Sequence, residues 1–141
     1  MRRISLSTAA LLALALLPSP AGAKEPYEGA WVTSPRHCKG DGPSSLTVID
    51  LKVNLDGKPV PMVEQYEHHC FIDSKSTSGS DTTVKATCYE FWDDYKKKVN
   101  GAKETIKLSL VSKDQLKING KPYKRCPEKA SAAKDVKPEK R

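Results

Sequence analysis

The sequence lacks the short motifs that mark common catalytic and nucleotide-binding sites. It contains no G-x-S-x-G, no H-E-x-x-H and no glycine-rich loop able to hold a phosphate. Its serine, histidine and acidic residues are not spaced as in a nucleophilic triad. We therefore predict a protein that is not an enzyme and that needs no cofactor.

Dense blocks of lysine and arginine interleaved with aromatic residues are also missing, which argues against nucleic-acid binding. The net charge is +7, from 24 basic and 17 acidic residues among 141. A modest charge of this kind is typical of a solvated surface that keeps a protein soluble. We predict no nucleic-acid partner.

No apolar run reaches the roughly 20 residues that a membrane-spanning helix needs. The longest, Ile4 to Leu17, follows Arg2 and Arg3 and precedes Ala21-Gly22-Ala23, as in a secretion signal. We predict a signal peptide over residues 1–23, cleaved after Ala23, and a periplasmic or secreted protein without a membrane span. Removing 23 of the 141 residues leaves 118, enough for one domain, with a net charge of +5 because two arginines are lost.

Four cysteines remain after cleavage, an even number that predicts two disulfides in a small exported domain. Three pairings are possible. Residues 62–92 indicate one of them, because apolar side chains alternate on either side of a turn-forming stretch, Ser76 to Asp81. Folding this hairpin about Gly79 places Cys70 opposite Cys88, and elimination then leaves Cys38–Cys126. The same register pairs Ile72 with Ala86, His68 with Glu90 and Tyr66 with Trp92.

Several further short strands are predicted, and most are separated by turn signals. Residues 46–55 alternate, with Ile49, Leu51, Val53 and Leu55 on one face, and Asp56-Gly57, Asn100-Gly101 and Asn119-Gly120 are hairpin signals. Residues 93–99 fit either a strand extension or a single helical turn, and we find no convincing helix. The expected fold is all-β over residues 24–126, a small antiparallel meander barrel of about seven or eight strands, with a β-sandwich as the alternative. Residues 127–141 are predicted to be a disordered basic tail.

Each histidine lies beside another histidine or a cysteine, which raises the question of a metal site at His68, His69 and Glu90. His68 and His69 point to opposite faces of a strand, and an oxidising compartment favours disulfides over thiolate ligands. We therefore predict no metal, with His68 paired to Glu90. The acidic residues Asp93 and Asp94 are read as a solvated turn.

Aromatic residues provide the candidate binding positions. Tyr89 and Phe91 have the opposite parity to Cys88, so they face away from the predicted core. Together with Tyr95 and a basic rim of Lys96, Lys97 and Lys98, they form the predicted binding surface. The alternative is that the following loop covers them. Three other aromatic residues are expected in the barrel interior, Trp31, Tyr66 and Trp92.

The start Gly29-Ala30-Trp31, with a disulfide tying the ends of the domain, resembles lipocalin-like barrels and small exported proteobacterial barrels, which include periplasmic inhibitors of secreted metalloproteases. The resemblance implies that Trp31 closes the barrel floor. Small lysozyme-inhibiting barrels are a third relative, and the positive charge argues against that activity. We expect a monomeric, non-enzymatic periplasmic binding module, an inhibitor of or adaptor for an envelope or secreted protein. The alternative is a carrier of a small apolar ligand inside the barrel.

Overall fold

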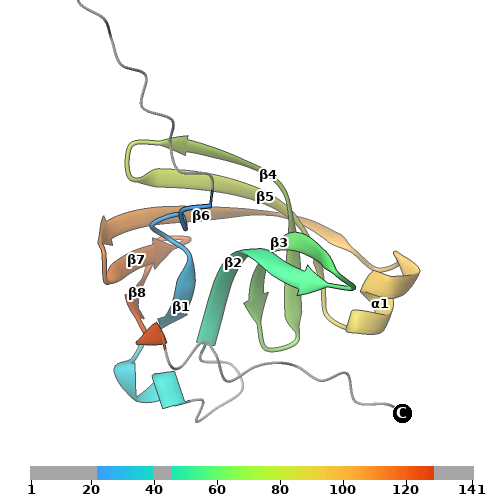
Figure 1. The fold of residues 1–141 in the computed structure, drawn as a ribbon, viewed down its shortest axis with the longest axis horizontal. Coiled ribbons are helices and arrows are strands. Elements are labelled where there is room, and N and C mark those ends of the chain that lie inside the picture. Colours follow the sequence, from blue (N-terminus) through green and yellow to red (C-terminus); the bar gives the residue numbers. More distant parts are fainter. Residues whose placement is uncertain (1–21, 40–45, 129–141) are drawn as a thin grey trace, which may run out of the picture.

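The computed structural model describes residues 22–39 and 46–128, which form a closed barrel of antiparallel strands paired in chain order, with the first strand returning to pair with the last (Figure 1). The predicted meander barrel is confirmed, and the sandwich alternative is wrong. The predicted signal peptide up to residue 21 and the predicted tail from residue 129 lie outside the described residues. The elements are β1 (Gly29–Val32), η1 (Pro35–Lys39), β2 (Leu46–Leu55), β3 (Lys58–Gln65), β4 (His68–Ser78), β5 (Asp81–Tyr89), α1 (Trp92–Lys97), β6 (Ala102–Ser112), β7 (Gln115–Ile118) and β8 (Lys121–Arg125).

Two of the three predicted hairpin turns are present. Asp56-Gly57 joins β2 to β3 and Asn119-Gly120 joins β7 to β8, with positive φ at all four residues, as a two-residue primed turn requires. The hairpin predicted at Asn100-Gly101 is wrong, because this pair instead leads from α1 into β6. Gly101 is needed there for close packing, since a Cβ atom on it would lie 2.9 Å from the ring of Tyr89.

The central hairpin of β4 and β5 has the predicted pairs Cys70–Cys88 and Ile72–Ala86. Its turn contains two residues, Gly79 and Ser80, so its centre is displaced from Gly79. A register shift between Ile72 and Ser74 compensates for that displacement. The disulfide register was therefore predicted correctly although the turn was placed slightly wrongly.

The first arm of that hairpin is shorter than predicted. A tight turn at Tyr66-Glu67 separates β3 from β4, with Glu67 at φ 50°. The predicted pair Tyr66–Trp92 is therefore wrong, and Met62 faces the outside of the barrel, whereas Cys70 faces the inside. The predicted pair His68–Glu90 is also wrong, because β5 ends at Tyr89. Neither residue of this turn is a strong turn former, so composition gave no signal for it.

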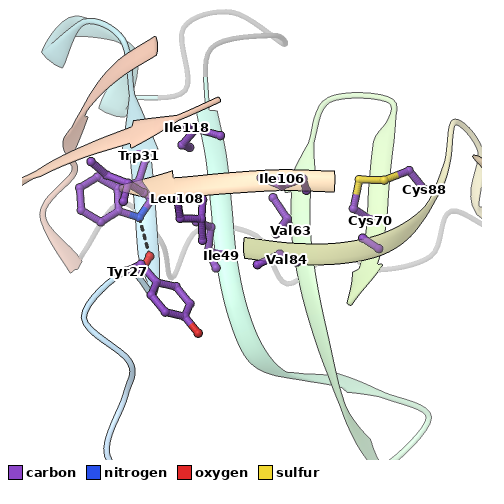
Figure 2. Packing of buried hydrophobic residues seen from close by; sticks show 12 residues of the cluster. Tyr27, Trp31, Ile49, Val63, Cys70, Val84, Cys88, Ile106, Leu108 and Ile118 are labelled. Carbon is purple, nitrogen blue, oxygen red and sulfur yellow. Dashed lines mark hydrogen bonds between the residues drawn. A yellow bond between two sulfur atoms is a disulfide. The ribbon is translucent and has the colours of Figure 1, made fainter. Parts of the chain in front are cut away.

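The barrel interior is filled by apolar side chains that run from Trp31 at one end to the Cys70–Cys88 disulfide at the other (Figure 2). Trp31 is fully buried, as predicted, and its indole Nε1 donates a hydrogen bond of 2.8 Å to the carbonyl of Tyr27. The buried members of this cluster are Tyr27, Trp31, Ile49, Val63, Cys70, Val84, Ala86, Cys88, Ile106, Leu108, Leu116 and Ile118.

Strand β2 does not keep one face towards the interior along its whole length. Ile49 and Leu51 pack in the barrel core, whereas Val53 and Leu55 pack against a second cluster outside it. The reason is a register shift against β3 between Asp50 and Val53, because a β-bulge redirects the side chains that follow it. The prediction that all four odd positions face the same way is therefore wrong.

Both predicted disulfides are present. Cys70–Cys88 joins neighbouring strands, and Cys38–Cys126 joins η1 to the residue after β8 across a sequence separation of 88. In the chain-entropy description, closing the shorter loop stabilises the folded protein by about 3 kcal/mol and closing the longer one by more than ~4 kcal/mol. Two disulfides indicate an oxidising, exported environment. Neither helix in the described ranges has the length and apolar character needed to cross a membrane.

Candidate functional site

Helix α1 is held on the outside of the barrel by aromatic side chains, which we call the outer aromatic cluster: Phe71, Tyr89, Trp92 and Tyr95. The rings of Phe71 and Tyr95 stack with centroids 3.8 Å apart and planes 6° apart. Tyr89 and Trp92 each meet Tyr95 edge to face, at 5.6 and 6.0 Å. Such contacts fix the position of a helix that is too short to be stable alone.

Two of the predicted site residues lie in this cluster. Tyr89 does face away from the barrel interior, but only 8% of it is exposed because α1 covers it, which was the alternative considered for this position. Tyr95 is half-buried between Phe71 and Tyr89. The two tyrosines therefore pack between α1 and the barrel, and neither offers its full ring to a partner.

The exposed apolar residues of this region flank α1. Phe91, just before the helix, is 51% exposed, and Val99, just after it, is 44% exposed. Lys96 and Lys97 are exposed in the last turn of the helix. The sequence predicts Phe91 as a binding residue but gives no such signal for Val99, because residues 93–99 fit either a strand extension or a helical turn.

Lys98 has a structural role in addition to its charge. It ends α1 in the left-handed conformation, with φ 55°, and its backbone N–H faces the carbonyls of Asp94 and Tyr95. Its ammonium lies over the Tyr95 ring, 3.6 Å from the centroid, which favours a cation–π contact. We define the α1 surface as Phe91, Lys96, Lys97, Lys98 and Val99.

Two of the three residues predicted in the barrel interior lie outside it. Tyr66 is 56% exposed in the β3–β4 turn, and Trp92 packs on the outer face beside His69, with ring centroids 4.5 Å apart. Both predictions depended on a pairing that the Tyr66-Glu67 turn prevents. A ligand carried inside the barrel would therefore lack two of its three expected lining residues.

A polar group lies on the inner face at the end of the barrel opposite Trp31. His68 Nε2 is 3.2 Å from Glu104 Oε2, and both side chains are more than one-third exposed. The Cys70–Cys88 disulfide lies directly inside them, and one ligand atom from each of the four residues falls within 4.8 Å of the others. We call these residues the barrel-end cluster.

Sequence reasoning missed Glu104, because its closeness to His68 depends on the pairing of β5 with β6, a long-range contact. Glu90, the expected partner of His68, is exposed beyond the end of β5. The prediction that His68 and His69 point to opposite faces is consistent with their contacts. His69 lies on the outer face, with Nδ1 3.6 Å from Glu64 Oε1.

The surface formed by the described residues includes two hollows that lie away from both the α1 surface and the barrel-end cluster. One, of about 310 Å³, is lined by Leu51, Pro61 and the bulged segment 72–75 of β4. The other, of about 270 Å³, lies over β7 and β8 and is lined by Leu116 and Tyr123 among others. Neither is lined by the α1 surface or by the barrel-end cluster.

Among the described residues, three side chains have clearly shifted pKa values. Hydrogen bonds from Lys103 and Thr87 lower the pKa of Asp73, and a hydrogen bond to Glu25 raises the pKa of Lys75. Burial raises the pKa of Tyr27, with the neighbouring Lys75 opposing that effect. These groups join the strands and the segment before β1, so their role is in stability.

Comparisons of the chain with known protein families, curated proteins and solved structures found no match. The class that the fold defines is a closed eight-stranded antiparallel barrel with two disulfides and an aromatic-anchored helix on its outer face. The likeness to lipocalin-like and small periplasmic barrels stays a prediction.

Proposed function

We propose that the protein is a non-enzymatic binding module that docks an acidic protein partner on the α1 surface. The observation that carries this proposal is the exposure of Phe91 and Val99 on either side of a helix fixed by stacked aromatic rings. Exposed apolar side chains rimmed by charge are typical of protein interaction sites. Lys96 and Lys97 provide that rim.

The rigid support of the α1 surface favours binding. Tyr95 is held against Phe71 and Tyr89 on one side, and Lys98 covers its ring from another. A surface that is ordered before binding loses less conformational entropy when a partner docks. The three lysines of the α1 surface outnumber the exposed acids Glu90 and Asp93 at this helix. This balance favours an acidic partner, because complementary charge speeds encounter and disfavours basic partners.

The proposed setting is the periplasm, reached by cleavage of residues 1–23, with the protein acting as a monomer. The Arg-Arg start, the apolar run and the Ala-Gly-Ala site of the sequence support this proposal. In that setting the partner is an envelope or secreted protein, which the module inhibits or tethers. The resemblance to exported barrel inhibitors is consistent with this role.

The test places a photo-crosslinking amino acid at Phe91 in the protein as it is exported, with the same residue at Tyr66 as the matched control. Tyr66 is similarly exposed but lies outside the α1 surface. We expect one acidic protein to be crosslinked from position 91 and not from position 66. For that purified partner, Phe91→Ser should raise Kd at least about tenfold, the loss expected for an interface hot spot.

Charge reversal provides the second readout. Lys96→Glu with Lys97→Glu should slow association and reduce its dependence on salt, because steering by surface charge acts mainly on the on-rate. Crosslinking that is equal from both positions would contradict the proposal, as would a Kd unchanged by Phe91→Ser.

A further inference from the structure

We propose that the barrel-end cluster becomes a Zn²⁺ site when the Cys70–Cys88 disulfide is reduced. The ligands would be the imidazole of His68, the carboxylate of Glu104 and the two thiolates released from the disulfide. This inference is independent of the proposed binding function, because it uses no residue of the α1 surface.

The placement of these residues follows from the strand register. Cys70 pairs with Cys88 across β4 and β5, and Glu104 pairs with Ala86, two residues from Cys88 on β5. Residues two apart on a strand share a face, so His68, Cys70, Cys88 and Glu104 all point to the inner side of the barrel end. Three neighbouring strands thus contribute ligands to one point.

The distances are close to those of a tetrahedral zinc centre. Zinc bonds of about 2.0–2.1 Å to nitrogen and oxygen and about 2.3 Å to sulfur place neighbouring ligand atoms roughly 3.3–3.8 Å apart. His68 Nε2 and Glu104 Oε2 are already 3.2 Å apart. All four ligand atoms lie within 4.8 Å of one another, so the most distant ligand has to move by about 1 Å. The two sulfur atoms, which a disulfide bond holds about 2.05 Å apart, have to separate by roughly 1.7 Å once the bond is reduced.

The burial pattern gives the metal a route to the site. His68 and Glu104 are more than one-third exposed, whereas Cys70 and Cys88 are 1% and 3% exposed. A cation arriving from solvent would meet the imidazole and carboxylate first, with the sulfur atoms on its inner side. Two thiolates and an imidazole favour zinc over magnesium or calcium, which prefer oxygen ligands.

The state of the disulfide controls the site, because the bonded sulfur atoms are not thiolates. A dithiol reductant transfers two electrons and two protons to the bridge, which becomes two thiols while the reductant becomes a disulfide. Binding of Zn²⁺ then releases two protons from those thiols. No metal is predicted from the sequence, and this proposal departs from that prediction for the reduced protein, in which the two sulfur atoms become available as donors.

The Cys38–Cys126 disulfide has no comparable group of histidine and acidic side chains around it in the described part of the chain. Among the described residues, the barrel-end cluster is the only group of three or more histidine, cysteine and acidic side chains brought together in this way. The Cys38–Cys126 bridge therefore serves as an internal control, since its thiols are released by the same reductant.

The experiment titrates Co²⁺, a spectroscopic substitute for zinc, into the full chain after reduction with dithiothreitol and anaerobic removal of the reductant. We expect one equivalent to bind, with a thiolate-to-cobalt charge-transfer band and the intense visible bands of tetrahedral cobalt, all lost when Zn²⁺ displaces it. The oxidised chain should show none of these bands. Circular dichroism reports whether the reduced chain keeps its strands.

Matched variants separate this site from non-specific thiol binding. His68→Ala and Glu104→Ala should each weaken Co²⁺ binding by more than about tenfold, in line with the loss of a zinc-site contact. His37→Ala, beside Cys38, and Glu90→Ala should leave it unchanged. Cys70→Ser with Cys88→Ser should abolish binding, whereas Cys38→Ser with Cys126→Ser should preserve it.

Any of three results would overturn the proposal: no metal bound by the reduced chain, equal binding by the oxidised chain, or an affinity insensitive to His68→Ala and Glu104→Ala. A chain that unfolds on reduction and binds cobalt through its thiols alone gives the third result. The outcome is therefore informative even if the fold is lost.

Discussion

Arg125 closes the Trp31 end of the barrel, and replacing it with lysine is the sharpest test of that role. Its guanidinium lies over the Trp31 ring, 4.1 Å from the centroid. Its three nitrogen atoms donate hydrogen bonds of 2.6 Å each to the carbonyls of Glu28, Pro26 and Lys113. The side chain is only 26% exposed. One residue of β8 thus joins the segment before β1 and the β6–β7 turn.

Arg125→Lys keeps the charge but removes the planar fork that reaches three acceptors. An ammonium in this position can satisfy one of them, so two hydrogen bonds are lost at roughly 1 kcal/mol each. The weaker contact with the ring adds ~0.5–1 kcal/mol. We expect a total loss of about 3 kcal/mol in the free energy of unfolding, which corresponds to a Tm lower by roughly 10–20 °C for a domain of this size.

Urea unfolding followed by tryptophan fluorescence measures this loss. Arg36→Lys is the matched control, because Arg36 is exposed and its side-chain contact is a bond of 3.3 Å to the neighbouring His37. That variant should stay within about 0.5 kcal/mol of the wild type. A loss below about 1 kcal/mol for Arg125→Lys would refute the view that this side chain closes the barrel.

Three further predictions concern the same framework. Gly29→Ala should lower the free energy of unfolding by about 2 kcal/mol, measured with urea, because Gly29 has φ 140° and a Cβ atom would lie 2.6 Å from Arg125 Nη1. Since the two residues would clash, the losses caused by Gly29→Ala and Arg125→Lys should not add in the double variant, and additive losses would contradict this explanation. Tyr27→Phe should change stability at pH 7 by less than about 1 kcal/mol, because removing a buried hydroxyl without a close hydrogen-bond partner among the described residues is opposed by the loss of its interaction with Lys75. The folded pKa of Tyr27 is raised above 10.0, so the neutral hydroxyl favours the folded state below pH 10, and this stabilisation is lost as the pH rises through the folded pKa. The free energy of unfolding should therefore fall less steeply at alkaline pH in Tyr27→Phe than in the wild type. The same steepness in both proteins would count against the argument. Asp73→Asn should lower stability at pH 7 by less than about 1 kcal/mol, because the Asp73 side chain is 45% exposed and water screens its ion pair with Lys103. Since its folded pKa lies below 3.8, that contribution is present above pH 4 and disappears as the pH falls through the folded pKa, so thermal unfolding at pH 7 and pH 2 should differ less in the variant.

Local patterns were sufficient to predict the barrel and both disulfides. The alternation of apolar residues and the Asp-Gly and Asn-Gly turns gave most of the strands, because each signal depends on residues close in sequence. The register of Cys70 and Cys88 was correct because two displacements cancelled, one in the turn after Ser78 and one at the bulge near Asp73. Agreement of that kind is partly fortunate.

The errors arose where the structure depends on contacts that are distant in the sequence. The turn at Tyr66-Glu67 contains no glycine, proline or asparagine, and Glu67 adopts φ 50° because the neighbouring strands impose it. Glu104 meets His68 only after β6 pairs with β5. The helix over residues 92–97 exists because Phe71 and Tyr89 provide a surface for Tyr95, and no periodicity in six residues reveals that.

The Cys38–Cys126 bridge also determines how the protein would respond to mechanical force. A pull applied to the two termini passes through the sulfur atoms, because β1 precedes Cys38 and every other strand lies between the two cysteines. The force can detach β1 from β2 and β8, but it cannot extend the loop between the cysteines. That loop would add roughly 300 Å of contour length if the bridge were absent. In single-molecule stretching, the oxidised protein should therefore release only the short segment that precedes Cys38, and a reducing agent should release the length held between the cysteines.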